Sequence, residues 1–135
     1  MRLWPLSILP QLPRQQLLGQ HRECCALRGK GWNRRHATVD YVFSHPYFWL
    51  FFYHKYVIEE MMKRGYHFTS EWGYVDYRGK KIGFQHDKFT SWTETDTEYL
   101  LVHENVYPEH NAAYLEECIA NLARKGVVID RKKVA

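Results

Sequence analysis

The chain has 135 residues, 16% of them aromatic, and a formal net charge of +4 at pH 7. Its length predicts a single domain over residues 1–135 with one hydrophobic core, and its blocks of apolar residues exclude a disordered chain. Three cysteines exclude a disulfide framework, and the aromatic run at residues 47–53 is far shorter than the roughly 20 residues that span a bilayer, so we expect a cytoplasmic protein without a membrane partner.

Residues 1–39 carry most of the positive charge. They hold seven basic residues and one acid, Glu23, so their formal charge is +6 and the rest of the chain sums to −2. Such a one-sided basic segment favours a polyanionic partner, either nucleic acid or an anionic membrane surface, although solubility alone would also account for it. Prolines at positions 5, 10 and 13 break the apolar start, so we expect no targeting segment.

A helix is expected over residues 13–29, because proline suits a first turn and glycine suits the position after the last turn. At helical spacing its apolar stripe consists of Leu17, Leu18, His21, Cys24 and Cys25. The other side combines two small residues with a polar trio, namely Gln15, Gly19, Arg22, Glu23 and Ala26. A ligand or another backbone could approach this second face closely.

Two further helical segments follow. The first is short, lies within residues 33–43, and has Arg34, Arg35 and His36 at its N-terminal end. The second runs from Ser44, a plausible N-cap followed by Pro46, to Gly65. Its first half is apolar on nearly all sides, which is typical of a core helix rather than of a cofactor site.

The C-terminal half begins with a different pattern. Arg78-Gly79 separates two short aromatic and β-branched runs, which predicts a small β-hairpin or a loop insertion around residues 72–90. Thr95 with Glu98 fits a capping box ahead of a short helix over residues 98–104. A last helix is expected from near Pro108 to Gly126. The expected fold class is therefore mainly α, a compact single-domain helical bundle with one small insertion.

Metal and triad chemistry have little support in the sequence. His21, Cys24 and Cys25 share a helical face, but no Cys-x-x-Cys pair occurs and adjacent helical cysteines cannot both face one ion, so we expect no metal site. Buried structural cysteines are the simpler interpretation. The histidines are scattered without a serine or cysteine motif, and no phosphate loop or pair of catalytic carboxylates can be identified.

The basic segment with its lone acid has two interpretations. Arg22, Glu23 and Arg28 could form a surface ion-pair cluster worth less than about 1 kcal/mol. Alternatively, the arginines bind phosphates and Glu23 is a general acid/base. Residue types alone do not decide between these interpretations.

The stretch LPRQQLLGQHRECCALRG, with RRH shortly after it, resembles the pyrimidine-dimer DNA glycosylase family, the phage endonuclease V family, in its bacterial branch. This resemblance implies a DNA repair enzyme that cleaves the glycosidic bond of a damaged pyrimidine and then nicks the abasic site by β-elimination, without a cofactor. It implies that the α-amine of Met1 is the nucleophile, that Glu23 is the catalytic acid, and that double-stranded DNA with damaged or abasic sites is the partner. The DNA-contacting residues implied in the same way are Arg2, Gln15, Arg22, Arg28, Arg34, Arg35 and His36.

The implied chemistry suits these residues. An α-amine has a pKa of about 7.7–8.0, so a useful fraction is neutral and nucleophilic at physiological pH. Arg2 is bulky, so we expect Met1 to be retained, and we expect a monomer. Two other classes of function stay open: a non-catalytic nucleic-acid-binding protein on the same scaffold, and an enzyme that modifies another nucleic acid.

Overall fold

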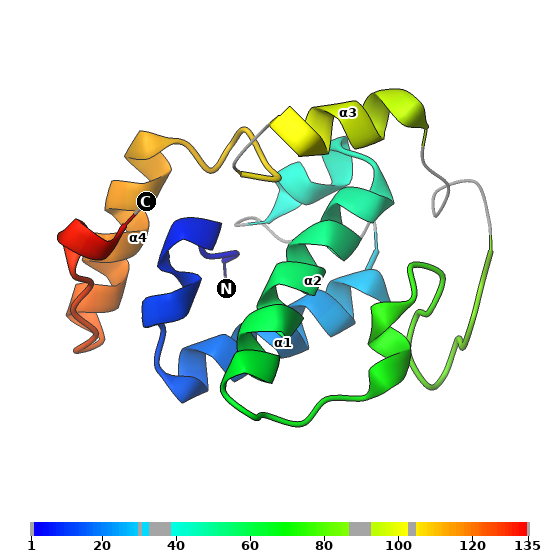
Figure 1. Cartoon of the computed structure of the whole chain (residues 1–135), viewed down its shortest axis with the longest axis horizontal. Coiled ribbons are helices and arrows are strands. Elements are labelled where there is room, and N and C mark those ends of the chain that lie inside the picture. The colour runs from blue at the N-terminus through cyan, green and yellow to red at the C-terminus, as the bar shows by residue number, and fades with distance from the viewer. Residues whose placement is uncertain (1, 30, 33–38, 87–92, 103–104, 135) are drawn as a thin grey trace.

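The computed structural model describes residues 2–29, 31–32, 39–86, 93–102 and 105–134, and it is mainly helical, as predicted (Figure 1). Its α-helices are α1 (Arg14–Arg28), α2 (Tyr47–Lys63), α3 (Glu94–Val102) and α4 (Ala112–Arg124). Short 3₁₀ helices lie between and beyond them, namely η1 (Leu6–Gln11), η2 (Asp40–Ser44), η3 (Ser70–Gly73) and η4 (Arg131–Lys133).

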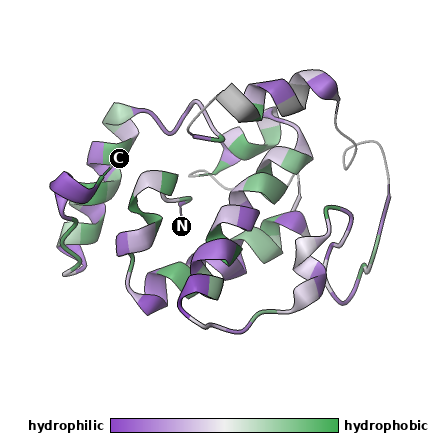
Figure 2. Ribbon diagram, in the orientation of Figure 1, coloured by the Kyte–Doolittle hydropathy of each residue, from purple (hydrophilic) through white to green (hydrophobic). Residues whose placement is uncertain are grey.

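The core is centred on α2, which packs against α1 and against η1. The N-terminal half of α2 is buried on most of its sides, as predicted, through Tyr47, Phe48, Trp49, Leu50, Tyr53 and His54. Its C-terminal end is hydrophilic (Figure 2). Burying one large apolar side chain stabilises a fold by about 1.5–3 kcal/mol, so this helix supplies much of the driving force for folding. Within the described ranges, every helix is too short or too polar to cross a membrane.

The first twelve residues belong to the core. Three of their apolar side chains are almost completely buried, namely Leu3, Ile8 and Leu12. Pro10 lies in η1, next to its last residue. Arg64, the C-cap of α2, donates to the carbonyl oxygens of Leu9, Pro10 and Leu12 at 2.7–3.2 Å. These bonds tie the C-terminal end of α2 to the end of η1, where the Leu9 carbonyl also accepts from the Leu12 N–H at 3.2 Å.

Three predicted helix starts are wrong. Pro46, and not Ser44, is the N-cap of α2, because Ser44 is the last residue of η2. Thr95 lies inside α3, which begins at Glu94, so it is not an N-cap residue. The N-cap of α4 is Asn111, whose side chain accepts from the Tyr114 backbone N–H at 2.9 Å, so Pro108 lies outside the helix.

The structure shows no hairpin among the described residues of the segment predicted as a small β-hairpin or a loop insertion. A single antiparallel bridge joins Tyr77 to Phe84, and the described residues form no strand, while residues 87–90 of the predicted insertion lie outside the described ranges. The short helix predicted within residues 33–43 can be assessed only from residue 39, where η2 begins one residue later. Residues 33–38 lie outside the described ranges.

Gly29 joins this loop to α1. It is the C-cap of α1 with φ −87°, so a left-handed conformation does not explain the glycine. A Cβ atom there would lie 2.9 Å from the carbonyl oxygen of Arg78, a distance that real Cβ contacts do not show. Arg78 in turn donates to the carbonyl oxygens of Arg28 and Gly29 at 2.9 and 3.1 Å. The glycine therefore permits the loop to pack directly on the end of α1.

Candidate functional site

An open cavity of about 740 Å³ lies along one side of α1. The α1 residues that line it include all five of the face predicted to admit a ligand, and they are Gln15, Gln16, Gly19, Gln20, Arg22, Glu23 and Ala26. The opposite wall is formed by Arg2 and Trp4 and by Asn121 and Lys125 at the end of α4. The predicted face is therefore the wall of a cavity large enough for part of a nucleotide.

Glu23 is the single carboxylate among the lining residues, and its side chain is only 4% exposed. Three cationic side chains, Arg2, Arg22 and Lys125, line the same cavity. A carboxylate in such a wall can exchange a proton with a bound molecule, while the surrounding cations attract phosphate groups. The Oδ1 atom of Asn121 is buried and has no hydrogen-bond partner in the part of the chain that the structure describes, which leaves an acceptor for a ligand hydroxyl or amine.

The backbone of residues 2–4, which we call the N-terminal arm, is held by side chains from three helices. Gln20 of α1 donates through Nε2 to the Arg2 carbonyl at 3.1 Å and accepts at Oε1 from the Trp4 N–H at 2.6 Å. The Tyr53 hydroxyl of α2 lies 2.6 Å from the Trp4 carbonyl and 2.7 Å from Gln20 Oε1, so it donates between these two acceptors. Buried polar networks of this kind fix a segment firmly when every member is satisfied.

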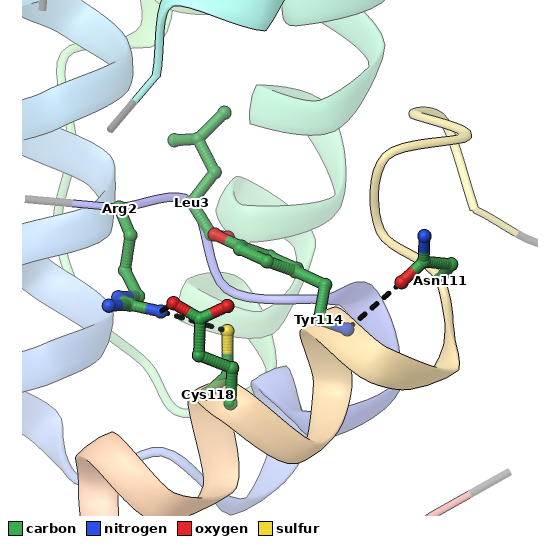
Figure 3. Close-up of polar contacts among 6 residues, drawn as sticks. Arg2, Leu3, Asn111, Tyr114 and Cys118 are labelled. Atoms are coloured by element: carbon green, nitrogen blue, oxygen red, sulfur yellow. Dashed lines mark hydrogen bonds and ion pairs between the residues drawn. The ribbon is translucent and has the colours of Figure 1, made fainter. Parts of the chain in front are cut away.

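The third contact comes from α4. The Tyr114 hydroxyl donates to the Leu3 carbonyl at 2.8 Å, and Figure 3 shows the tyrosine reaching across from α4 to the arm. Beside it, the Arg2 guanidinium points towards α4, where Nη1 lies 3.3 Å from Glu117 Oε1 and 3.8 Å from Cys118 Sγ (Figure 3). These contacts hold Arg2 and Leu3 against α4, beside the cavity that Arg2 helps to line.

The structure brings four of the predicted site residues together. Arg2, Gln15, Arg22 and Glu23 line one cavity, with Gln15 and Arg22 exposed and Arg2 partly buried in its ion pair with Glu117. Met1, Arg34, Arg35 and His36 lie outside the described residues. Sequence reasoning missed the residues that hold the arm, Gln20, Tyr53 and Tyr114, and it missed Lys125, because nothing in their local patterns connects them to Glu23.

Arg28 requires a correction, since it is fully buried and does not line the cavity. Its guanidinium donates to three backbone carbonyls of the segment after α2, those of Trp72, Tyr74 and Tyr77, at 2.7–3.3 Å. It also donates to the Tyr47 hydroxyl and to His54 Nδ1 at 3.2 and 2.9 Å. A phosphate would have to displace these partners, so Arg28 is a structural residue that joins α1, α2 and the following loop.

His21, Cys25 and His54 form a second polar cluster, with their ligand-type atoms all within 4.8 Å of one another. Because Arg28 donates to His54 Nδ1, the proton of that imidazole resides on Nε2, which donates to His21 Nδ1 at 2.8 Å. Burial, with Arg28 as a second cause, lowers the pKa of His54 well below its usual value and keeps the ring neutral. A cation bound here would displace that proton beside an arginine, so the hydrogen-bond pattern favours a structural cluster.

Cys25 is not an activated nucleophile despite its histidine neighbours. Its Sγ lies 3.7 Å from His21 Nε2 and 3.9 Å from His54 Nε2. Burial raises the pKa of the Cys25 thiol to about 12, more than the Arg28 cation offsets, so the thiolate is scarce at neutral pH. Burial also raises the pKa of Cys24 well above its usual value, and both residues are structural, as the sequence suggested.

A comparison with protein families matches residues 1–74 to the family described as pyrimidine dimer DNA glycosylase. The match includes the N-terminal arm and every α1 residue that lines the cavity, and it ends within the segment that follows α2. No curated protein and no solved structure matches the chain.

Proposed function

The chain belongs to the family of pyrimidine dimer DNA glycosylases, and we propose that it is a DNA-repair glycosylase with an associated lyase activity at abasic sites. The observation that carries this proposal is the placement of Glu23 in the wall of a cation-lined cavity that the anchored N-terminal arm also lines. Glycosylase and lyase chemistry through an imine needs an amine and a proton-transfer group within reach of the same sugar carbon.

In the proposed reaction the α-amine of Met1 attacks C1′ of the damaged nucleotide and the N–C1′ bond forms. The base leaves with the electron pair of the glycosidic bond and takes up the proton that the attacking amine loses. Glu23 donates a proton to the ring oxygen as the sugar opens to a Schiff base. The resulting carboxylate then accepts the C2′ proton that the iminium acidifies, and the 3′ phosphate leaves by β-elimination. One carboxylate thus serves both steps, and the reaction needs no metal or cofactor.

The anchoring of the arm supports the amine as the nucleophile. Three side chains from different helices form hydrogen bonds to the backbone of residues 2–4. These bonds satisfy polar groups that would otherwise be buried without a partner. Holding a nucleophile beside its reaction partner can contribute several kcal/mol to a reaction barrier, through the entropy that is lost before the reaction begins.

The proposed substrate is double-stranded DNA that contains a damaged pyrimidine or an abasic site. Arg22 and Gln15 are exposed at the cavity and are the proposed phosphate and sugar contacts. Arg2 would bind phosphate only by releasing or sharing its ion pair with Glu117. We also propose that the DNA backbone is contacted by Arg34, Arg35 and His36. We expect the protein to be cytoplasmic and monomeric.

An abasic-site nicking assay in the presence of a metal chelator tests the proposal. We expect the wild-type chain to cleave a duplex with one abasic site into a β-elimination product, and Glu23→Gln to bind the same duplex without comparable cleavage. Tight binding by the wild-type chain without nicking would contradict the enzymatic proposal and would support the non-catalytic nucleic-acid-binding alternative.

A further inference from the structure

The end of α1 carries a second basic surface beyond the residues that match the family. Residues 76–85, which we call the basic loop, include three cationic residues and one acid, Asp76. The loop is closed by hydrogen bonds from the Arg78 N–H to the Gly83 carbonyl and from the Gln85 N–H to the Asp76 carbonyl, at 3.0 and 2.8 Å. Arg78 ties it to the Arg28 and Gly29 carbonyls of α1. The loop is therefore attached rigidly to the helix that carries Glu23.

The middle of the basic loop is exposed to solvent, at Lys80, Lys81 and Ile82. These residues line an open cavity of about 420 Å³ together with Gly29 and Gly31. Ala26 lines both this cavity and the cavity of Glu23, so the two hollows adjoin along α1. None of the described residues that line the second cavity is a carboxylate. The positive potential of the Glu23 cavity thus continues to the end of the helix, where Figure 1 shows the loop beside α1.

The basic loop and the residue before it also expose large apolar and aromatic side chains, which a loop that is merely charged and solvated does not need. Tyr74, just before it, is 61% exposed, and Ile82 and Phe84 are 36% and 57% exposed. The Tyr74 and Phe84 rings pack edge to face with centroids 5.9 Å apart. Exposed rings among lysines are typical of surfaces that bind nucleic acid, since bases stack on aromatic rings and phosphates contact the cations.

We propose that Lys80 and Lys81 contact the DNA backbone on one side of the lesion, so that the duplex runs along α1 from the Glu23 cavity to the basic loop. This inference rests on the proposed function for the position of the lesion. From Glu23 to Gly29 the helix rises about 9 Å, and DNA rises about 3.4 Å per base pair, so the phosphates contacted are roughly three nucleotides from the lesion.

The test compares the double variant Lys80→Ala/Lys81→Ala with Lys132→Ala/Lys133→Ala, which removes the same charge from exposed residues of η4 at the other end of the molecule. Binding to a duplex with a stable abasic analogue is measured by fluorescence anisotropy at several salt concentrations. We expect the loop variant to reduce the slope of log K against log salt by about 2, since each lysine–phosphate contact contributes about 1. Single methylphosphonate substitutions near the third nucleotide on one side should weaken wild-type binding but not binding by the loop variant.

An unchanged slope in the loop variant, or a loss equal to that of the η4 variant, would overturn the inference. The readout is binding, so it separates the two proposals. Should the wild-type chain fail to nick abasic DNA while the loop variant still loses about two units of slope, the loop contact stands and the proposed enzymatic activity fails. Should the wild-type chain nick abasic DNA while the salt slopes of the wild-type chain and the loop variant are equal, the proposed enzymatic activity stands and the loop contact fails.

Discussion

Gln20 and Glu23 lie on successive turns of α1 and line one cavity. Gln20 holds the backbone of the N-terminal arm, and Glu23 is the only carboxylate among the described residues that line the cavity. Since side chains three residues apart are neighbours on a helix surface, the residue that positions the proposed nucleophile is adjacent to the proposed acid. One face of α1 therefore carries both the proposed acid and one of the three side chains that hold the arm.

Gln20→Ala tests this positioning. Removing the amide leaves the Arg2 carbonyl and the Trp4 N–H without their partner, at an expected cost of about 1–3 kcal/mol in the free energy of unfolding. We expect single-turnover formation of a borohydride-trapped adduct to slow by about 10–100-fold, because a shift of about 1 Å in a reacting group can have this effect. DNA affinity should hold. Gln16→Ala, at a residue lining the same cavity one turn earlier, is the control, and equal rates for both variants would contradict the positioning role.

Glu23→Gln tests proton transfer. The substitution keeps the size of the side chain and removes the exchangeable acid, so we expect the glycosylase rate to fall by about 10²–10⁴. DNA affinity should stay the same or rise, because one negative charge leaves a cavity that is proposed to bind phosphates. Single-turnover cleavage of a dimer-containing duplex and anisotropy on the same duplex measure the two effects. A wild-type rate in Glu23→Gln would reduce Glu23 to a partner of neighbouring cations.

Arg28→Lys tests the structural assignment of Arg28. A lysine cannot reach the three carbonyls and the imidazole that the guanidinium serves, so we expect a loss of about 2–4 kcal/mol in the free energy of unfolding. Urea denaturation measures this loss. Arg22→Lys, at an exposed position of the same helix, should change stability by less than about 0.5 kcal/mol. Arg28→Met removes the charge as well, and a lowered salt slope of DNA binding in folded Arg28→Met, under stabilising conditions, would restore Arg28 to the DNA contacts.

Buried histidines predict acid sensitivity. Burial lowers the pKa of His110 to about 4, and burial and Arg28 lower the pKa of His54 well below its usual value. Between about pH 6.5 and 4 the unfolded chain therefore binds protons that the folded chain excludes, so stability is present above pH 6.5 and falls with pH. We expect His110→Gln to reduce this slope by about 1.4 kcal/mol per pH unit over that window, measured by urea denaturation. His67→Gln, at an exposed histidine, is the control. Equal slopes in both variants would contradict the assignment.

Local patterns were sufficient for some parts of the fold and site. The helical periodicity of α1 identified the face that lines the cavity, because apolar core residues and cavity-lining residues repeat at helical spacing on different sides of this helix. Pairing across long distances was not predictable: the bonds from Tyr53 and Tyr114 to the arm join residues 49 and 111 positions apart. The DNA contact predicted for Arg28 does not fit its buried position. Arg28 is five residues beyond Glu23 and points inwards, and only its bonds to the carbonyls of the distant segment after α2 reveal this.

Lys125 provides the direct alternative to Met1 as the amine. It lines the same cavity from the end of α4, with Nζ 5.5 Å from the centroid of the Trp4 ring. Lysine amines also form Schiff bases with sugar aldehydes. The central mechanistic claim is therefore a choice between the proposed Met1 amine and the Lys125 amine, and it can be decided by locating the covalent bond.

Borohydride trapping with abasic DNA, followed by peptide mapping of the adduct, makes this decision. Intact mass first establishes that Met1 is retained with a free α-amine. We predict an adduct on Met1, its formation at a wild-type rate in Lys125→Gln, and its loss when the terminus is acetylated or extended by a tag while the fold is kept. An adduct on Lys125, or undiminished trapping by the acetylated chain, would contradict the proposed mechanism.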